Sequence, residues 1–169
     1  MKFGFIDLLT IIAGCVGYWG GKRKGIVLAL YKLAGLCVGV FMFYRFYRIF
    51  KPLTEWGGSN KVYAIALLGM VLAVLIVFRI IWIFIYRFID IKPDLEIKEI
   101  IAGVIGAVYG VMWMAVVLKA LHYFEYKPIL DVIRGTFSER YIMPLPLLIY
   151  KAIVTIGGKV FSGGKIYET

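Results

Sequence analysis

Four long apolar runs alternate with polar connections along most of the chain. The runs cover residues 3–21, 25–44, 62–89 and 98–121, and few charged residues interrupt them. A membrane-spanning helix needs about 20 predominantly apolar residues, so each run is long enough to cross a bilayer. Short connections make consecutive spans antiparallel neighbours. The pattern therefore predicts an all-α integral membrane protein with a four-span, four-helix unit over residues 1–122.

The last part of the chain, residues 123–169, follows a different pattern. Residues 141–156 are apolar, but Pro144 and Pro146 interrupt them and the stretch is shorter than a comfortable span. Such a segment is typical of an interfacial or re-entrant element, and a fifth crossing is the alternative. Glycine pairs from Gly157 onward indicate a flexible tail. We therefore expect an amphipathic, partly re-entrant C-terminal segment.

Composition places the chain outside the class of soluble domains. Hydrophobic residues make up 62% of its 169 residues, whereas a soluble domain has roughly 45–50%. The formal net charge is +10, and basic residues cluster at the ends of the apolar runs. This distribution is typical of contacts with lipid phosphates and of topology signals. No basic stripe carries a nucleic-acid motif, so the expected partner is a bilayer with anionic headgroups and not a nucleic acid.

The sequence lacks the patterns that would indicate catalysis or metal binding. His122 is the one histidine, and Cys15 and Cys37 fall in apolar runs without metal-ligand spacing. The acidic residues between 90 and 99 are more typical of a solvated loop than of a metal site. The chain has no phosphate-binding loop and no dinucleotide fingerprint. We therefore expect no enzymatic activity, no metal and no cofactor.

Several charged or titratable side chains fall inside the apolar runs or at their ends: Asp7, Lys32, Arg79, Lys119 and His122. A charge within a bilayer is costly unless it is paired or reaches water. The hairpin topology puts Asp7, Lys119 and His122 near one membrane side, so we predict that Asp7 contacts Lys119 with His122 close by. Lys32 and Arg79 lie toward the other side. Two interpretations stay open for them: long side chains that reach lipid phosphates individually, or an anion or headgroup site between the helices.

Glycines recur at the spacing of helix-packing motifs. Small residues at this spacing let two helix backbones approach closely in a membrane. Packing within the four-span unit and an oligomer interface are the two alternatives for these faces. The residues concerned are Gly17, Gly21, Gly35, Gly39, Gly103, Gly106 and Gly110.

The first hairpin and the fourth run carry a recognisable combination of motifs. Ile6 and Asp7 stand near the start of the first run, and Gly106 and Gly110 lie in the fourth. A basic turn between the first two runs consists of Lys22, Arg23, Lys24 and Gly25. With these motifs, residues 3–121 resemble the colicin V production protein (CvpA) family. Its members begin with an Ile-Asp or Val-Asp pair, join their first two spans by a basic-glycine turn and have a glycine-spaced fourth span.

Some positions depart from the pattern of that family. Leu28 and Ala29 stand where members often have Arg-Glu, and Tyr109 stands where an Arg often precedes the last glycine of the fourth span. A function that relies on those polar groups does not carry over to this chain. Asp7 and the basic turn do carry over.

The resemblance implies a bacterial inner-membrane protein that supports colicin V production or export and envelope integrity. The first hypothesis is a non-enzymatic scaffold or accessory subunit of a larger membrane complex. The second is an oligomeric transporter or channel subunit for a small solute or ion, because four spans are few for a transporter that acts alone. The side with both termini has more Lys and Arg, which favours cytoplasmic termini. Relatives that carry an extracytoplasmic protease after four spans imply the opposite orientation.

Overall fold

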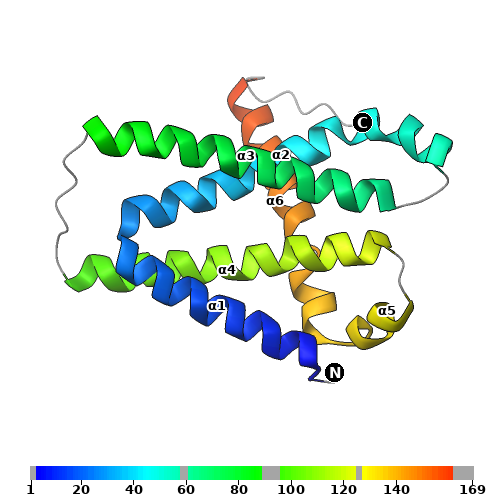
Figure 1. Ribbon diagram of the computed structural model, residues 1–169, viewed down its shortest axis with the longest axis horizontal. Coiled ribbons are helices and arrows are strands. Elements are labelled where there is room, and N and C mark those ends of the chain that lie inside the picture. Colours follow the sequence, from blue (N-terminus) through cyan, green and yellow to red (C-terminus); the bar gives the residue numbers. More distant parts are fainter. Residues whose placement is uncertain (1–2, 58–60, 89–95, 125–126, 162–169) are drawn as a thin grey trace.

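The computed structural model describes residues 3–57, 61–88, 96–124 and 127–161, and this part of the chain is built from helices (Figure 1). The all-α prediction is confirmed, and the four apolar runs correspond to the first four helices. In chain order the elements are α1 (Phe5–Lys24), α2 (Ile26–Gly57), α3 (Lys61–Phe88), α4 (Glu96–Phe124), α5 (Lys127–Ile133), the π-helix η1 (Ser138–Ile142) and α6 (Leu145–Phe161).

Two antiparallel helix pairs form the body of the structure. α1 packs mainly against α4, and α2 packs mainly against α3 and α4. Figure 1 shows α1 beside α4 and α2 beside α3. Although α1 and α2 are consecutive in the sequence, they make few contacts with each other. The first hairpin is therefore splayed, and its two helices belong to different pairs.

The connection between α1 and α2 is one glycine and not a separate basic turn. Lys22, Arg23 and Lys24 belong to the last turn of α1. Cations are favourable there because the last turn of a helix carries a partial negative charge. Gly25 follows with φ 83° and ψ 162°. A residue with a Cβ atom rarely adopts this conformation, so the glycine allows the chain to reverse at this point.

α2 extends further than the sequence pattern predicted. We expected a loop over residues 45–61, because Pro52 and a glycine pair interrupt that stretch, but the helix continues to Gly57. A proline removes one N–H donor and strains the preceding turn. The residues on its C-terminal side remain free to be helical. Residues 58–60, the glycine-containing end of the expected loop, lie outside the described residues.

Four segments of the described chain are long and apolar enough to cross a membrane. They are Ile26–Phe46 in α2, Lys61–Phe84 in α3, Glu99–Phe124 in α4, and Ser138–Gly157 across η1 and α6. The structure and the prediction agree in the number of candidate spans but not in which segments they are. α1, which was predicted to be the first span, is not among the four. The C-terminal segment, which we expected to be interfacial, is one of them.

The composition of α1 explains why it falls outside this set. It contains Asp7, several glycines and a basic last turn, all of which lower its apolarity. Its 20 residues nevertheless reach about 30 Å, the thickness of a hydrocarbon core. One face of the helix is exposed and apolar, with the large side chains Phe5, Leu8, Ile12, Val16 and Trp19. α1 therefore has the length and the outer surface of a membrane helix, with Asp7 and Thr10 turned inward.

α6 lies across the other long helices and not alongside them (Figure 1). Its Tyr150 ring lies 5.7 Å from Phe41 and 5.3 Å from Tyr44, measured between ring centroids. Both partners are near the end of the apolar part of α2. Length and composition qualify α6 as a span, but its direction favours an interfacial position if α2, α3 and α4 cross the bilayer. α6 extends to Phe161 and so includes the first residues of the predicted tail, whereas residues 162–169 lie outside the described residues.

The core lies where α2, α3 and α4 meet. A second, smaller cluster joins Ile6 of α1, Leu118 of α4 and Ile133 of α5. These clusters hold the two helix pairs together and attach α5 to the end of the bundle that carries the N-terminus. The main core contains the buried side chains Leu36, Val40, Phe43, Leu67, Val71, Met112 and Val116.

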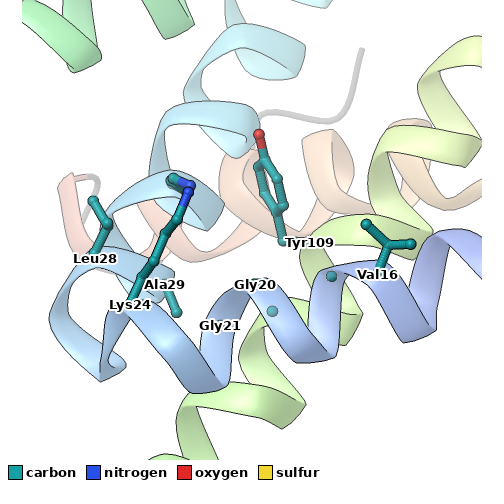
Figure 2. A pocket seen from close by; sticks show the side chains of 10 residues that line it. Val16, Gly20, Gly21, Lys24, Leu28, Ala29 and Tyr109 are labelled. Carbon is teal, nitrogen blue, oxygen red and sulfur yellow. The ribbon is translucent and has the colours of Figure 1, made fainter.

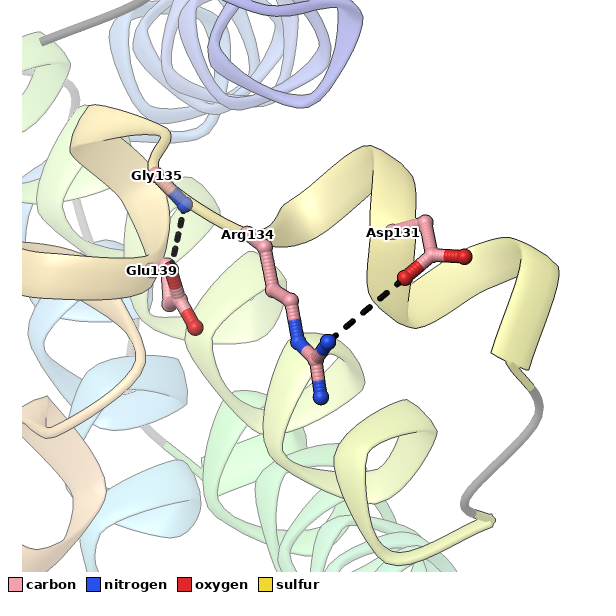
Figure 3. Close-up of polar contacts among 4 residues, drawn as sticks. All are labelled: Asp131, Arg134, Gly135 and Glu139. Carbon is pink, nitrogen blue, oxygen red and sulfur yellow. Dashed lines mark hydrogen bonds and ion pairs between the residues drawn. The ribbon is translucent and has the colours of Figure 1, made fainter.

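A tight connection leads from α5 into η1 (Figure 3). Gly135 has φ 76°, and its backbone N–H donates to the Glu139 carboxylate at 2.7 Å. Arg134 forms an exposed ion pair of 3.7 Å with Asp131. The Glu139 contact fixes the start of η1, and this places Ser138 opposite the first turn of α1.

Candidate functional site

Asp7 is a buried carboxylate whose partners are backbone N–H groups. It lies in the first turn of α1 and is 2% exposed. The N–H of Gly4 donates to Oδ2 at 2.9 Å, and the N–H of Ser138 donates to Oδ1 at 2.7 Å. Hydrogen bonds from backbone amides to an ionised carboxylate are among the strong ones. Asp7 therefore joins the start of α1 to η1, which is distant in the sequence.

Two hydroxyl groups extend this buried polar cluster. The Thr10 hydroxyl donates to the carbonyl of Ile6 at 2.9 Å and lies 3.0 Å from the Ser138 hydroxyl. Thr10 is 7% exposed and Ser138 has no exposed surface. Buried polar groups are costly unless they are hydrogen-bonded, and here each has a partner. The cluster is a structural link between α1 and the C-terminal segment.

The predicted contact between Asp7 and Lys119 is wrong. The sequence argument paired the carboxylate with a cation, whereas the structure gives it backbone donors. Lys119 is half-buried, and its Nζ lies 5.2 Å from the centre of the Tyr123 ring. His122 is exposed near the end of α4. Asp7 and Lys119 therefore have separate partners.

Lys32 and Arg79 line one cavity at the opposite end of the bundle. The cavity has a volume of about 760 Å³ and lies between the helix pairs, with lining residues from α1, α2, α3 and α4. Arg23 and Lys24 from the last turn of α1 complete a set of four cations around it. The structure thus brings Lys32 and Arg79 together, as the interpretation of an anion or headgroup site between the helices requires.

Aromatic side chains form the wall of the same cavity on α2 and α3. The Tyr31 ring lies 5.0 Å from Phe78 and 5.1 Å from Trp82, measured between centroids. The Tyr31 hydroxyl donates to the carbonyl of Phe78 at 2.9 Å, which fixes the ring on α3. Aromatic rings with a polar edge are typical of the region near lipid headgroups.

A smaller cavity of about 170 Å³ shares Lys24, Leu28, Lys32 and Tyr109 with the larger one. Figure 2 shows the Lys24 and Tyr109 side chains extending into this space beside α1. The Tyr109 hydroxyl accepts a hydrogen bond from the indole N–H of Trp113 at 2.7 Å. Leu28 and Tyr109, together with the nearby Ala29, are positions where the sequence departs from the CvpA pattern, and all three line this space.

No described carboxylate lines either cavity. Glu99 is nearby in the sequence of α4, but it forms an ion pair of 3.7 Å with Lys22, which is not a lining residue. The Arg23 guanidinium lies 5.4 Å from the centre of the Trp19 ring. The other described carboxylates, Asp7, Asp131 and Glu139, have partners elsewhere. The cavity therefore gathers positive charge that these carboxylates do not neutralise.

The predicted packing glycines lie at contacts between helices of the same chain. A Cβ atom at Gly17 would collide with the carbonyl oxygen of Gly106, and one at Gly21 would collide with that of Ala102. These contacts favour packing within the chain over an oligomer interface. The remaining predicted glycines, Gly35, Gly39, Gly103 and Gly110, face Phe78, Val71, Tyr18 and Ala13 in turn.

Sequence reasoning missed the partners of both sites. Ser138 gave no signal, because its role depends on a backbone N–H and not on its side-chain type. A signal for Asp7 was present in its position three residues after Gly4, where an acidic side chain can accept the N–H that precedes a helix. Tyr31 and Trp82 could have been found because they stand next to Lys32 and one helical turn after Arg79.

The arrangement suits anion binding better than acid-base or metal chemistry. The described residues contain no group of three His, Cys, Asp or Glu side chains that could hold a metal ion. Lys and Arg side chains beside an aromatic wall can hold an anionic oxygen by charge-assisted hydrogen bonds. The two ends of the bundle thus differ: one is a structural link and the other is a cationic cavity.

The Asp7–Ser138 bond and both cavities fall within a region that matches a known protein family. A sequence profile of the family described as Colicin V production protein matches residues 6–143. The match begins beside Asp7, contains every cavity-lining residue and ends after η1, so it includes both partners of the Asp7–Ser138 bond. No curated protein and no solved structure matches the chain. Since the profile covers most of the 169 residues, and the helices are those of a membrane protein, this chain belongs to the colicin V production protein family.

Proposed function

We propose that the protein is a non-enzymatic scaffold or accessory subunit of the bacterial inner membrane that supports secretion or envelope integrity. The observation that carries the proposal is the closed interior of the bundle. Leu36, Val40, Leu67 and Val71 have no exposed surface. They lie between the end that carries Asp7 and the end that carries the cationic cavity. A solute path through one chain would need polar or open surface there.

The contact between α1 and α4 also leaves no path for a solute between these two helices. Gly17 and Gly106 bring the two backbones so close that a Cβ atom on either would collide with the other helix. Helices that touch at this distance leave no room for water between them. The interior of one chain therefore supports a structural role better than a transport role.

The outer surface offers a place for partners. α3 exposes a row of large aliphatic side chains, which a second copy, a different membrane subunit or lipid can cover. These side chains are Ile65, Leu72, Ile76, Ile80 and Ile83. In this proposal the partners are other membrane proteins, either further copies of the chain or subunits of a larger complex.

An oligomeric transporter or channel subunit is the second candidate, and the cationic cavity favours it. Lys32 and Arg79 could receive an anion at one end of the bundle. Because the interior of the chain is closed, the path would have to run between copies. This candidate therefore requires an oligomer, whereas the scaffold does not.

Flux measurements on the purified chain in liposomes separate the two candidates. The scaffold proposal predicts that efflux of chloride or phosphate equals that of empty liposomes. It also predicts that cells lacking the protein admit a dye that an intact envelope excludes. Anion flux above the empty-liposome rate that falls in Lys32→Gln would contradict the proposal and favour the transporter.

A further inference from the structure

The cationic cavity lies toward the end of the bundle where α1 and α3 end and α2 begins. Lys32 is six residues after Ile26, where α2 begins, and Arg79 is nine residues before Phe88, where α3 ends. At about 1.5 Å per residue, their Cα atoms lie roughly 9 Å and 14 Å from these helix ends. Long side chains of Lys and Arg can extend from this depth to the phosphate level. Lys24 and Arg23 at the end of α1 line the same space.

The walls of the cavity divide into a charged part and an apolar part. The charged part comes from α1, from Lys32 and from Arg79, whereas Leu75, Phe78 and Ile83 of α3 supply apolar surface. The volume of about 760 Å³ is within the range of small-molecule sites. A phosphate group with an apolar substituent fits this division, because its oxygens can meet the cations while the substituent lies along α3.

Snorkelling by separate side chains does not account for the cavity. Side chains that reach lipid phosphates individually have no reason to converge, and four nearby cations repel one another. Lys24, Lys32 and Arg79 line one space, and no described carboxylate among the lining residues relieves their repulsion. A bound anion would offset it.

We propose that this cavity binds a phosphate group, supplied by an anionic phospholipid or as free phosphate, with Lys32 and Arg79 as its main ligands. The apolar wall on α3 favours the lipid as the source. The site is distinct from the scaffold role, so a failure of one proposal would leave the other standing.

The test uses the purified full chain in detergent micelles. Native mass spectrometry measures the retention of added phosphatidylglycerol against phosphatidylcholine, and calorimetry measures the binding of inorganic phosphate. The cavity variants are Lys32→Gln and Arg79→Gln, which remove the charge and keep a polar side chain. Lys22→Gln is the matched control, because it removes a cation at the same end of the bundle that does not line the cavity.

We expect phosphatidylglycerol to be retained in preference to phosphatidylcholine and each cavity variant to weaken its binding about fivefold, the effect of one basic residue near a lipid surface. Lys22→Gln should bind as the wild type does. Phosphate binding with the same dependence on the variants, but without preference for phosphatidylglycerol, supports the site and identifies free phosphate as the source. Equal retention of both lipids without phosphate binding, or equal weakening by Lys22→Gln, overturns the proposal.

Two further variants distinguish the loss of a charge in the cavity from an effect on folding. Lys24 is exposed, so Lys24→Gln removes a cavity charge from a position that does not contribute to the core. Arg79→Lys keeps the charge at its depth. Weaker binding by Lys24→Gln together with binding within about twofold of wild type by Arg79→Lys is expected from a site built on charge. Binding by Lys24→Gln as strong as that of the wild type, together with weaker binding by Arg79→Lys, would overturn the proposal.

Discussion

The Asp7 carboxylate accepts the backbone N–H of Ser138 at 2.7 Å, across a separation of 131 residues. This bond joins the first turn of α1 to the π-helix η1, from which α6 continues. The same carboxylate accepts the N–H of Gly4 at 2.9 Å. One acidic side chain therefore fixes both the start of the first helix and the position of the C-terminal segment.

Replacing Asp7 with alanine should lower the free energy of unfolding by about 1–3 kcal/mol, because two N–H groups lose their acceptor. Thermal or denaturant unfolding in detergent, followed by circular dichroism, measures this change. Asp131→Ala is the control, since Asp131 forms an ion pair whose side chains are 72% exposed and such pairs contribute about 0–1 kcal/mol. Equal effects of the two substitutions would show that the Asp7 contacts do not stabilise the fold.

The Thr10 and Ser138 hydroxyls lie 3.0 Å apart and are both buried. Thr10→Val and Ser138→Ala should each destabilise the protein by about 1–2 kcal/mol, since each leaves a hydroxyl without one partner. The double variant should cost less than the sum of the two, because it leaves neither hydroxyl behind. A double-mutant cycle on unfolding free energies measures this coupling. Strict additivity would mean that the two hydroxyls do not interact.

Neighbouring glycines of α1 should respond in opposite ways to a methyl group. In Gly21→Ala the Cβ atom collides with the carbonyl of Ala102, so we expect a loss of about 1–3 kcal/mol as α1 moves away from α4. In Gly20→Ala the Cβ atom meets nothing within 4 Å, so the change should stabilise α1 by up to about 1 kcal/mol. Unfolding midpoints in detergent compare the two variants. Similar midpoints would contradict the close packing of α1 and α4.

The direction of α6 predicts that its exposed residues lie at one depth. Spin labels at Leu148→Cys and Ile156→Cys, on exposed positions of α6, should report equal depth in liposomes if the helix is interfacial. If α6 crosses the bilayer, the two depths should differ by about 12 Å. Labels at Ile65→Cys and Ile76→Cys on α3 provide a reference, because their depths should differ by about 16 Å. A large difference on α6 would refute the interfacial position.

The helices of the body could be predicted because apolar periodicity is a local property of the sequence. The runs at 62–89 and 98–121 became α3 and α4 with shifts of a few residues. The glycine spacing also predicted close packing, because only a glycine permits backbones to touch. Charge pairing could not be predicted in the same way. Asp7 accepts hydrogen bonds from the backbone N–H groups of Gly4 and Ser138. Because the backbone N–H group does not depend on the type of side chain, no sequence pattern identifies the distant donor at Ser138.

The C-terminal segment was harder to predict because several weak signals compete there. Its apolarity is that of a span, its prolines suggest an interruption, and its glycines suggest a tail, yet residues 145–161 form one helix. Their position depends on Tyr150 packing against Phe41 and Tyr44 of α2. Tertiary contacts of this kind determine direction, and no local pattern encodes them.

Gentle solubilisation of the tagged chain from native membranes, with native mass determination and identification of co-purifying chains, tests the scaffold proposal most directly. The proposal predicts a complex that contains a different membrane or envelope protein in a fixed ratio to this chain. Mild crosslinking at the exposed face of α3, for example at Ile76→Cys, should capture the same protein. A complex composed of this chain alone, together with anion flux in liposomes, would contradict the proposal and favour an oligomeric transporter.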